Sequence, residues 1–187
     1  MKDLAILICH LPERYDFMKR LSSILDPQLQ KHKNNVICLS DDSRYKKIGR
    51  KRNDLVQRAV EAGAKYFCFI DDDDRISVNY LDLLMEGIHK DVDCCSLVGE
   101  ITFDGQNPKK FIHSLQYDHY FEKDNIYYRP PNHLNVVRTE IAKYYSFPEK
   151  NFSEDTEWAM QLCLSRMLKT EHEIKSTIYY YDYRSKK

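Results

Sequence analysis

Four consecutive carboxylates, Asp71 to Asp74, are the most chemically distinctive feature of this sequence. They follow an apolar run, residues 65–70, whose aromatic and β-forming side chains are typical of a buried central strand. Adjacent carboxylates repel one another, so we expect a cation among them. Carboxylate oxygens are hard ligands and suit Mg²⁺ or Mn²⁺. The alternative interpretation is a solvated acidic turn without a ligand.

A basic segment and a second acidic pair precede this run. Asp41 and Asp42 follow a short apolar stretch over residues 35–39, and so stand at another strand end. The basic side chains that come next are Arg44, Lys46, Lys47, Arg50, Lys51 and Arg52. Cationic groups near the start of a helix suit a phosphate. A solvated charged face explains such a run equally well.

A third acidic group begins a helix in the last quarter of the chain. Ser153 is a suitable N-cap residue, and Glu154 and Asp155 fall in the first turn. The apolar pattern that includes Trp158 extends this helix to about Leu168. Acids in a first turn can serve the helix dipole alone, and that is the alternative to a chemical role.

The elements that must position these groups follow from the hydrophobic pattern. The first part alternates strands and helices with short connections, which predicts parallel strands covered by helices. Apolar residues 93–98 predict one further buried strand. Beyond Gly99, short strands with turns at Asp104-Gly105 and around residues 123–124 predict a small antiparallel sheet. A short helix over 138–145 follows, and residues 174–183 predict a final edge strand. The fold class is therefore α/β.

Composition limits the possible classes of protein. The 187 residues suffice for one domain, and 29 basic against 29 acidic side chains leave no net charge to attract nucleic acid or membrane. The six cysteines form no C-x-x-C pair and are expected to be reduced. We find no signal peptide and no run long enough to span a bilayer, so we expect a cytoplasmic protein.

Five segments in this order resemble family 2-type glycosyltransferases with the GT-A fold. They are Leu11-Pro12-Glu13-Arg14, Asp41-Asp42, Gly49-Arg50-Lys51-Arg52-Asn53, Phe69-Ile70-Asp71-Asp72-Asp73-Asp74 and Ser153-Glu154-Asp155-Thr156-Glu157-Trp158. The resemblance covers nearly the whole chain. It implies a single Rossmann-like GT-A domain over 1–187, with a nucleotide-sugar-binding half (1–98) and an acceptor half (99–187). In its compact size and in the segment from Phe111 to His133, the chain resembles small glycosyltransferases carried by tailed bacteriophages. That resemblance would place the protein in the host cytoplasm.

The resemblance also implies roles for individual residues. Donor binding falls to Leu11, Pro12, Glu13, Arg14, Asp41, Asp42, Lys51, Arg52, Asp71 and Asp72. Within this set, Asp41 or Asp42 would hold base and ribose, and Lys51 and Arg52 would face the nucleotide or its phosphates. Asp73, with Asp71 and His133, would bind Mn²⁺ or Mg²⁺. Asp155 would be the general base that deprotonates the acceptor, with Glu154 as the next candidate.

The activity so implied is metal-dependent, inverting transfer of a sugar from a nucleoside-diphosphate sugar, with a UDP-sugar as the first candidate. The acceptor would be a hydroxymethylated base in phage DNA or a glycan, and the basic tail 184–187 could contact phosphates. Two alternatives stay open. A sugar nucleotidyltransferase would usually carry a glycine-rich loop where this chain has His10-Leu11-Pro12-Glu13. A non-catalytic nucleotide-sugar-binding module would need no intact acids.

Overall fold

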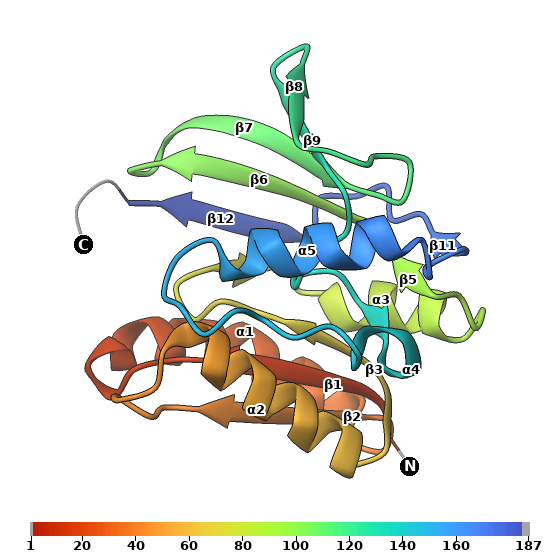
Figure 1. Ribbon diagram of the computed structural model, residues 1–187. Coiled ribbons are helices and arrows are strands. Elements are labelled where there is room, and N and C mark those ends of the chain that lie inside the picture. Colours follow the sequence, from red (N-terminus) through yellow and green to blue (C-terminus); the bar gives the residue numbers. More distant parts are fainter. Residues whose placement is uncertain (1, 185–187) are drawn as a thin grey trace.

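The computed structural model describes residues 2–184, and Figure 1 shows its arrangement. The strands and helices of the first part alternate as the hydrophobic pattern predicts. They are β1 (Lys2–Cys9), η1 (Pro12–Arg14), α1 (Tyr15–Lys31), β2 (Val36–Asp41), α2 (Ile48–Glu61) and β3 (Ala64–Phe69). Because β1 pairs in parallel with both β2 and β3, the carboxyl ends of these three strands meet at one edge of the sheet.

Three short strands from later in the chain complete this central sheet. They are β5 (Cys94–Cys95), β10 (Val137–Arg138) and β11 (Glu171–His172), in the order β11-β5-β10-β3-β1-β2. β10 is antiparallel to its two neighbours, and the other pairs are parallel. The mostly parallel central sheet is therefore confirmed. The single strand predicted over residues 93–98 divides at Ser96, because its two parts enter different sheets.

A second sheet of six strands packs against the first and lies above it in Figure 1. Its strands are β4 (Arg75–Ile76), β12 (Tyr179–Tyr183), β6 (Leu97–Phe103), β7 (Gln106–His113), β9 (Ile126–Arg129) and β8 (Phe121–Lys123). The predicted turns hold, since Asp104, Gly105 and Asp124 adopt positive φ angles. The sheet is mixed and not purely antiparallel, because β12 runs parallel to β6 and β7 runs parallel to β9. The edge position predicted for residues 174–183 is wrong: β12 lies between β4 and β6.

Helices cover both faces of the central sheet. The side chains of β1 alternate between two apolar clusters: Leu4, Ile6 and Ile8 belong to one, and Ala5, Leu7 and Cys9 belong to the other. The first cluster includes α1 and α3 (Tyr80–Ile88), and the second includes α2, α4 (Thr139–Ala142) and α5 (Glu154–Ser165). The apolar run before the acids is buried, as predicted. No helix within residues 2–184 has the length and apolarity needed to cross a bilayer.

Helix α5 begins at Glu154 as predicted, but its C-terminal end and the cap at Ser153 differ from the prediction. It stops at Ser165 and not near Leu168, because Arg166 turns into the left-handed region at φ 52°. Ser153 does precede the helix, but its φ is 59° and its hydroxyl makes no capping hydrogen bond. The side-chain cap predicted for Ser153 is therefore wrong. The apolar face is anchored by Trp158, which donates to the Tyr145 carbonyl (2.9 Å) and stacks on Phe147 (4.8 Å between ring centroids).

Candidate active site

The four carboxylates, hereafter the acid cluster (Asp71 to Asp74), lie in the loop that leaves β3. The backbone before them is fixed, because the Phe69 N–H donates to the His133 carbonyl (2.8 Å) and the Ile70 N–H donates to Leu7 (3.0 Å). Adjacent parallel strands thus hold the cluster at the carboxyl edge of the central sheet, the usual place for ligands in open α/β folds.

Two arginines supply the cations that the acid cluster was expected to attract. Arg14, at the end of η1, pairs with Asp72 (3.0 Å) and Asp73 (2.5 Å). Arg52, on α2, pairs with Asp71 (3.2 Å) and is buried. Both were predicted as donor-binding residues, and both stand at the acid cluster.

Arg52 also joins the two parts of the site. Its Nε lies 3.5 Å from the carboxylate of Glu154, the first residue of α5. The rings of Phe69 and Phe147 flank its guanidinium, with centroids 5.4 and 5.6 Å away. This packing holds Arg52 between Asp71 and Glu154, so its first role in the geometry is to fix the acid cluster relative to α5.

The remaining cations of the basic segment are mostly engaged within the protein. The buried Lys51 ammonium donates to the His10 carbonyl (2.9 Å), at the end of β1. Lys46 and Arg50 both pair with Asp54, at 2.9 Å each. Arg44 lies 3.4 Å from Glu13. These pairs leave little of the segment's charge for a phosphate. Of the predicted basic tail, residues 185–187 lie outside the described residues.

The acids of the cluster titrate differently because their surroundings differ. Burial would raise the pKa of Asp71, but the charges of Arg52 and His133 outweigh it and hold this pKa well below its ordinary value. Burial raises the pKa of Asp72 to about 7, against the charge of Arg14. Burial raises the pKa of Asp74 well above its ordinary value, and the charge of Asp71 adds to this rise. The cluster therefore carries fewer than four charges at neutral pH.

His133 connects the acid cluster to the predicted base. Its ring is buried, with Nε2 3.4 Å from Asp71 and Nδ1 3.7 Å from Asp155. The side chain of Asp155 is 32% exposed, whereas that of Glu154 is 5% exposed and turns to Arg52. Of the two predicted catalytic acids, Asp155 is thus the one that a substrate can reach.

A pocket of about 430 Å³ opens beside these groups and is hereafter the site pocket. Asp71, Asp74, His133 and Asp155 line it from the central sheet and α5. The loop before β10 adds Asn132 and Leu134, and the second sheet contributes the rest of the wall, with Ile101, Phe103, Phe111, His113, Tyr127, Arg129, Tyr181 and Tyr183. Of the acids predicted to serve donor and acceptor, Asp71 and Asp155 therefore share one cavity, whereas Asp72, Asp73 and Glu154 do not line it.

The residues predicted to hold base and ribose lie at the ends of β1 and β2. The His10 N–H donates to the Asp41 carbonyl (3.1 Å). The Asp41 carboxylate is buried and accepts from the Ser43 N–H (2.8 Å) and Lys46 (3.1 Å). Leu11 is half-buried, and Pro12, Glu13 and Asp42 are exposed. None of these residues lines the site pocket.

The acid cluster has unused oxygens that fit a divalent cation. One oxygen of Asp72 and both oxygens of Asp74 are buried without a hydrogen bond of good geometry to any described residue, although the Tyr179 hydroxyl is close enough to Asp74 to lower its pKa. Mg²⁺ commonly binds one or two carboxylates together with substrate phosphates and water, so such a donor set suits it. Within residues 2–184, no group of three or more His, Cys, Asp or Glu side chains is placed to hold a metal ion by itself.

The sequence-based prediction missed three side chains of this site. Asp74 lines the pocket, and its place at the end of the acidic run was a signal for it. The buried Tyr179 hydroxyl accepts the Asp71 N–H (3.1 Å), and Arg129 enters the pocket from β9. Nothing local distinguishes these two residues from neighbouring tyrosines and arginines.

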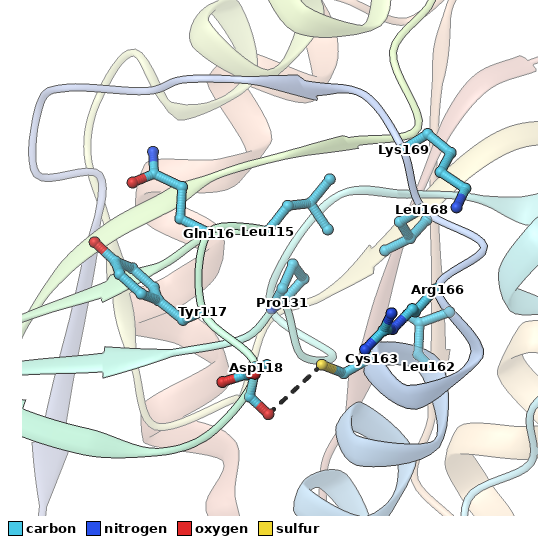
Figure 2. A pocket seen from close by; sticks show the side chains of 10 residues that line it. All are labelled: Leu115, Gln116, Tyr117, Asp118, Pro131, Leu162, Cys163, Arg166, Leu168 and Lys169. Atoms are coloured by element: carbon cyan, nitrogen blue, oxygen red, sulfur yellow. Dashed lines mark hydrogen bonds between the residues drawn. The ribbon is translucent and has the colours of Figure 1, made fainter.

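Figure 2 shows another cavity, of about 470 Å³, around the end of α5. Leu162, Cys163 and Arg166 line it from the helix, and the Cys163 thiol donates to the Asp118 carbonyl (3.7 Å). It contains none of the predicted site residues, since Asp155 stands at the other end of the helix.

Comparison with known proteins establishes the fold. No protein-family model and no curated protein matches the chain. The structure of S. aureus TarS 1-349 in complex with UDP-GlcNAc is similar, with a TM-score of 0.65 and 14% identity over 100% of this chain and 60% of that one. The complex of the same fragment with UDP gives a TM-score of 0.62 at 14% identity, over 98% of this chain and 61% of that one.

A solved glycosyltransferase extends the likeness to a chain of similar length. It is involved in the glycosylation of the major capsid of PBCV-1, with a TM-score of 0.52 and 12% identity over 96% of this chain and 93% of that one. By contrast, the present chain spans 60% of the TarS fragment. The likeness thus reaches across the whole chain, which shares the fold of these solved structures.

Proposed function

We propose that the chain transfers a sugar from a nucleoside-diphosphate sugar, with a UDP-sugar as the first candidate, to an acceptor hydroxyl. The observation that carries this proposal is the convergence of Asp71 and Asp155 on one pocket, with His133 between them. The shared fold supports it, because similar structures were solved with UDP-GlcNAc and with UDP.

In the proposed reaction, Asp155 accepts the proton of the acceptor hydroxyl as that oxygen bonds to the anomeric carbon. The bond from this carbon to the diphosphate breaks, and the nucleoside diphosphate leaves with the electron pair. One base and one leaving group on opposite faces give a single displacement with inversion. His133 lies between Asp71 and Asp155, 3.7 Å from the Asp155 carboxylate. Arg52 pairs with both Asp71 and Glu154 and so holds the acid cluster against the start of α5.

We further propose that the reaction uses Mn²⁺ or Mg²⁺. Asp71 and Asp73 would hold the ion, with His133 close by and the unpaired oxygens of Asp74 as further donors. When bound, the ion would supply positive charge that stabilises the leaving nucleoside diphosphate. When the ion binds Asp73, Arg14 would lose part of its contact with this carboxylate and could pair with the donor instead.

A panel of nucleotide sugars incubated with Mn²⁺ tests the function before any acceptor is known. We expect slow hydrolysis of one donor that releases nucleoside diphosphate and stops with EDTA. Asp73→Asn should abolish it, whereas Asp16→Asn, which removes an exposed acid from the first turn of α1, should not. Release of pyrophosphate would instead indicate a nucleotidyltransferase. No turnover of any donor would contradict the proposal.

Once the donor is known, hydroxymethylated DNA and glycans are the first acceptors to compare. The ion pairs of the basic segment leave little free charge there for a DNA backbone. The wall of the site pocket therefore becomes the main source of information about the acceptor.

A further inference from the structure

The wall that the second sheet presents to the site pocket is built from alternating residues of four strands. In the parallel pair of β7 and β9, Phe111 stands beside Tyr127 and His113 stands beside Arg129. Paired residues share a face of the sheet, and residues two apart return to that face. The wall is aromatic and aliphatic except at one corner, where the two polar side chains His113 and Arg129 are neighbours.

His113 adds no charge to this corner. The Asn135 amide donates through Nδ2 to the Cys95 carbonyl (2.9 Å), and its Oδ1 accepts the Asn132 N–H (3.0 Å). His113 Nδ1 lies 3.1 Å from the same Oδ1 and so must donate to it. Burial, with the charge of Arg129, lowers the pKa of His113 to about 3. The ring is therefore neutral at physiological pH.

Arg129 brings a positive charge to the corner without a carboxylate partner. Among the described residues, none places an acidic oxygen within ion-pair distance of its guanidinium. Its contacts are the rings of Tyr120 and Tyr127, with centroids 5.4 and 5.7 Å away. A half-buried, unpaired charge costs stability, and such costs are concentrated at functional sites. The rings orient the guanidinium, whose planar fork suits a phosphate or a carboxylate.

Arg129 and the proposed base, Asp155, line the same pocket. The Arg129 guanidinium lies over the Tyr120 ring, 5.4 Å from its centroid. Burial raises the pKa of Tyr120, the charge of Asp155 raises it further, and that of Arg129 lowers it. The acids expected to serve the donor, Asp71 and Asp73, pair with other arginines, Arg52 and Arg14. Arg129 shares the site pocket with Asp155, whereas Asp73 does not line it, so we assign an anion held by Arg129 to the acceptor.

We infer that the acceptor carries an anionic group, a phosphate or a carboxylate, close to the reacting hydroxyl, and that Arg129 binds this group. The inference rests on the proposed function, because it assigns the acceptor of that same site. Tyr127 and the other rings of the wall would pack on the adjoining carbon skeleton. A phosphodiester of DNA and an acidic sugar of a glycan both satisfy this chemistry, whereas a neutral glycan does not.

Three sugars that differ only at carbon 6 provide the test: glucose, glucuronate and glucose 6-phosphate. An NMR titration of the full chain with UDP and Mg²⁺ follows the side-chain N–H signal of Arg129. We expect both anions to shift this signal, and to bind about tenfold or more tightly than glucose, the effect of one charge-assisted hydrogen bond. The anion that binds more tightly shows whether Arg129 prefers a carboxylate or a phosphate.

Two variants distinguish anion binding by Arg129 from a non-specific effect of positive charge near the pocket. Arg129→Gln should remove the preference for the anions while leaving UDP affinity unchanged. The matched control is Lys109→Gln, since Lys109 also lies over the Tyr127 ring (4.0 Å) but already pairs with Glu122 (2.6 Å). That control should keep the preference. Equal affinity for the three sugars, or no response of Arg129 to either anion, would overturn the inference.

A weakened affinity of Arg129→Gln for UDP would also overturn it, because Arg129 would then serve the donor. The titration needs no turnover, so its result is independent of the donor-hydrolysis assay. Hydrolysis of a donor without a preference for the anions would support the proposed sugar transfer and contradict an anionic acceptor. A preference for the anions without hydrolysis of any donor would support the anion site at Arg129 but contradict the proposed sugar transfer.

Discussion

Two neighbouring acids show how their surroundings give side chains of similar chemistry different roles. Glu154 and Asp155 are adjacent in the first turn of α5, yet only Asp155 faces the site pocket. Glu154 is paired with Arg52, and burial raises the pKa of Glu154 against the charge of that arginine. A buried carboxyl held by an arginine is suited to positioning, whereas an accessible one can exchange a proton with a substrate.

Replacing Asp155 by Asn is therefore expected to affect transfer and not donor binding. The amide keeps the shape but cannot accept a proton at neutral pH, so transfer should fall by about 10²–10⁴-fold. Calorimetry of UDP binding and a transfer assay on the same preparation provide the two measurements. Near-native transfer by this variant would rule out Asp155 as the base, and Glu154→Gln would then be measured.

His113 predicts a pH dependence of stability. Its pKa is about 3 in the folded protein, against 6.5 ordinarily, so the unfolded chain binds the proton more readily. The stability contribution of neutral His113 is complete above about pH 6.5 and decreases as the pH falls toward 3, by at most about 1.4 kcal/mol per pH unit.

Urea unfolding of His113→Gln over this range should give a shallower loss of stability in acid than the native chain shows. The exposed His119 provides the control, and His119→Gln should retain the native slope. Parallel pH profiles for the native chain and His113→Gln would mean that other groups cause the acid sensitivity.

At the scale of elements, the start of α2 holds the loop that leads into α5. Asn53 exchanges two hydrogen bonds with the backbone of Phe147, both of 2.8 Å. The Gly49 N–H donates to the Lys150 carbonyl (3.2 Å), and the Ile48 N–H donates to the Asn151 side chain (3.1 Å). The position of Asp155 thus depends on close backbone contact between α2 and this loop.

Gly49→Ala tests this dependence. At an open helical position the change would stabilise the protein by up to about 1 kcal/mol. Here the added Cβ would lie 1.9 Å from the Pro148 carbonyl oxygen, so the loop must move. We expect a loss of about 1–3 kcal/mol in urea unfolding, together with reduced transfer. A stabilised variant with full activity would show that the loop adapts without moving Asp155.

At the scale of the whole molecule, the two predicted halves share both sheets. β10, from the second half, lies between β3 and β5, and β4, from the first half, pairs with β12. Arg52 of the first half is flanked by Phe147 and paired with Glu154. The nucleotide-binding part therefore depends on residues that follow it in sequence.

We expect a fragment of residues 1–98 to lack a cooperative thermal transition and to bind no UDP. It would expose the edge of β3 and leave Arg52 without the partners that cover it. Circular dichroism melting of the fragment beside the full chain is the measurement. A cooperative transition of the fragment would show that the halves are independent in stability.

The sequence by itself determined the order of the elements around the site. The alternation of apolar runs predicted where β1 to β3 and the helices between them lie in the sequence. This was possible because the spacing of apolar side chains is a local property of the chain. The acid cluster and the acids of α5 were also identifiable, since charge at a strand end or in a first turn can be read without a fold. The resemblance assigned chemical roles to the same residues.

Only the tertiary structure decided how those residues are used. It buried Arg52 between Asp71 and Glu154, left the half-buried Asp155 open to the site pocket, and placed Arg129 against two tyrosine rings with no carboxylate partner among the described residues. It also placed β12 between two other strands of the second sheet, and it added the short strands β5, β10 and β11 to the central sheet. These outcomes depend on contacts between segments far apart in the chain. Burial and pairing set the charge and reach of a side chain, and neither is encoded by its immediate neighbours.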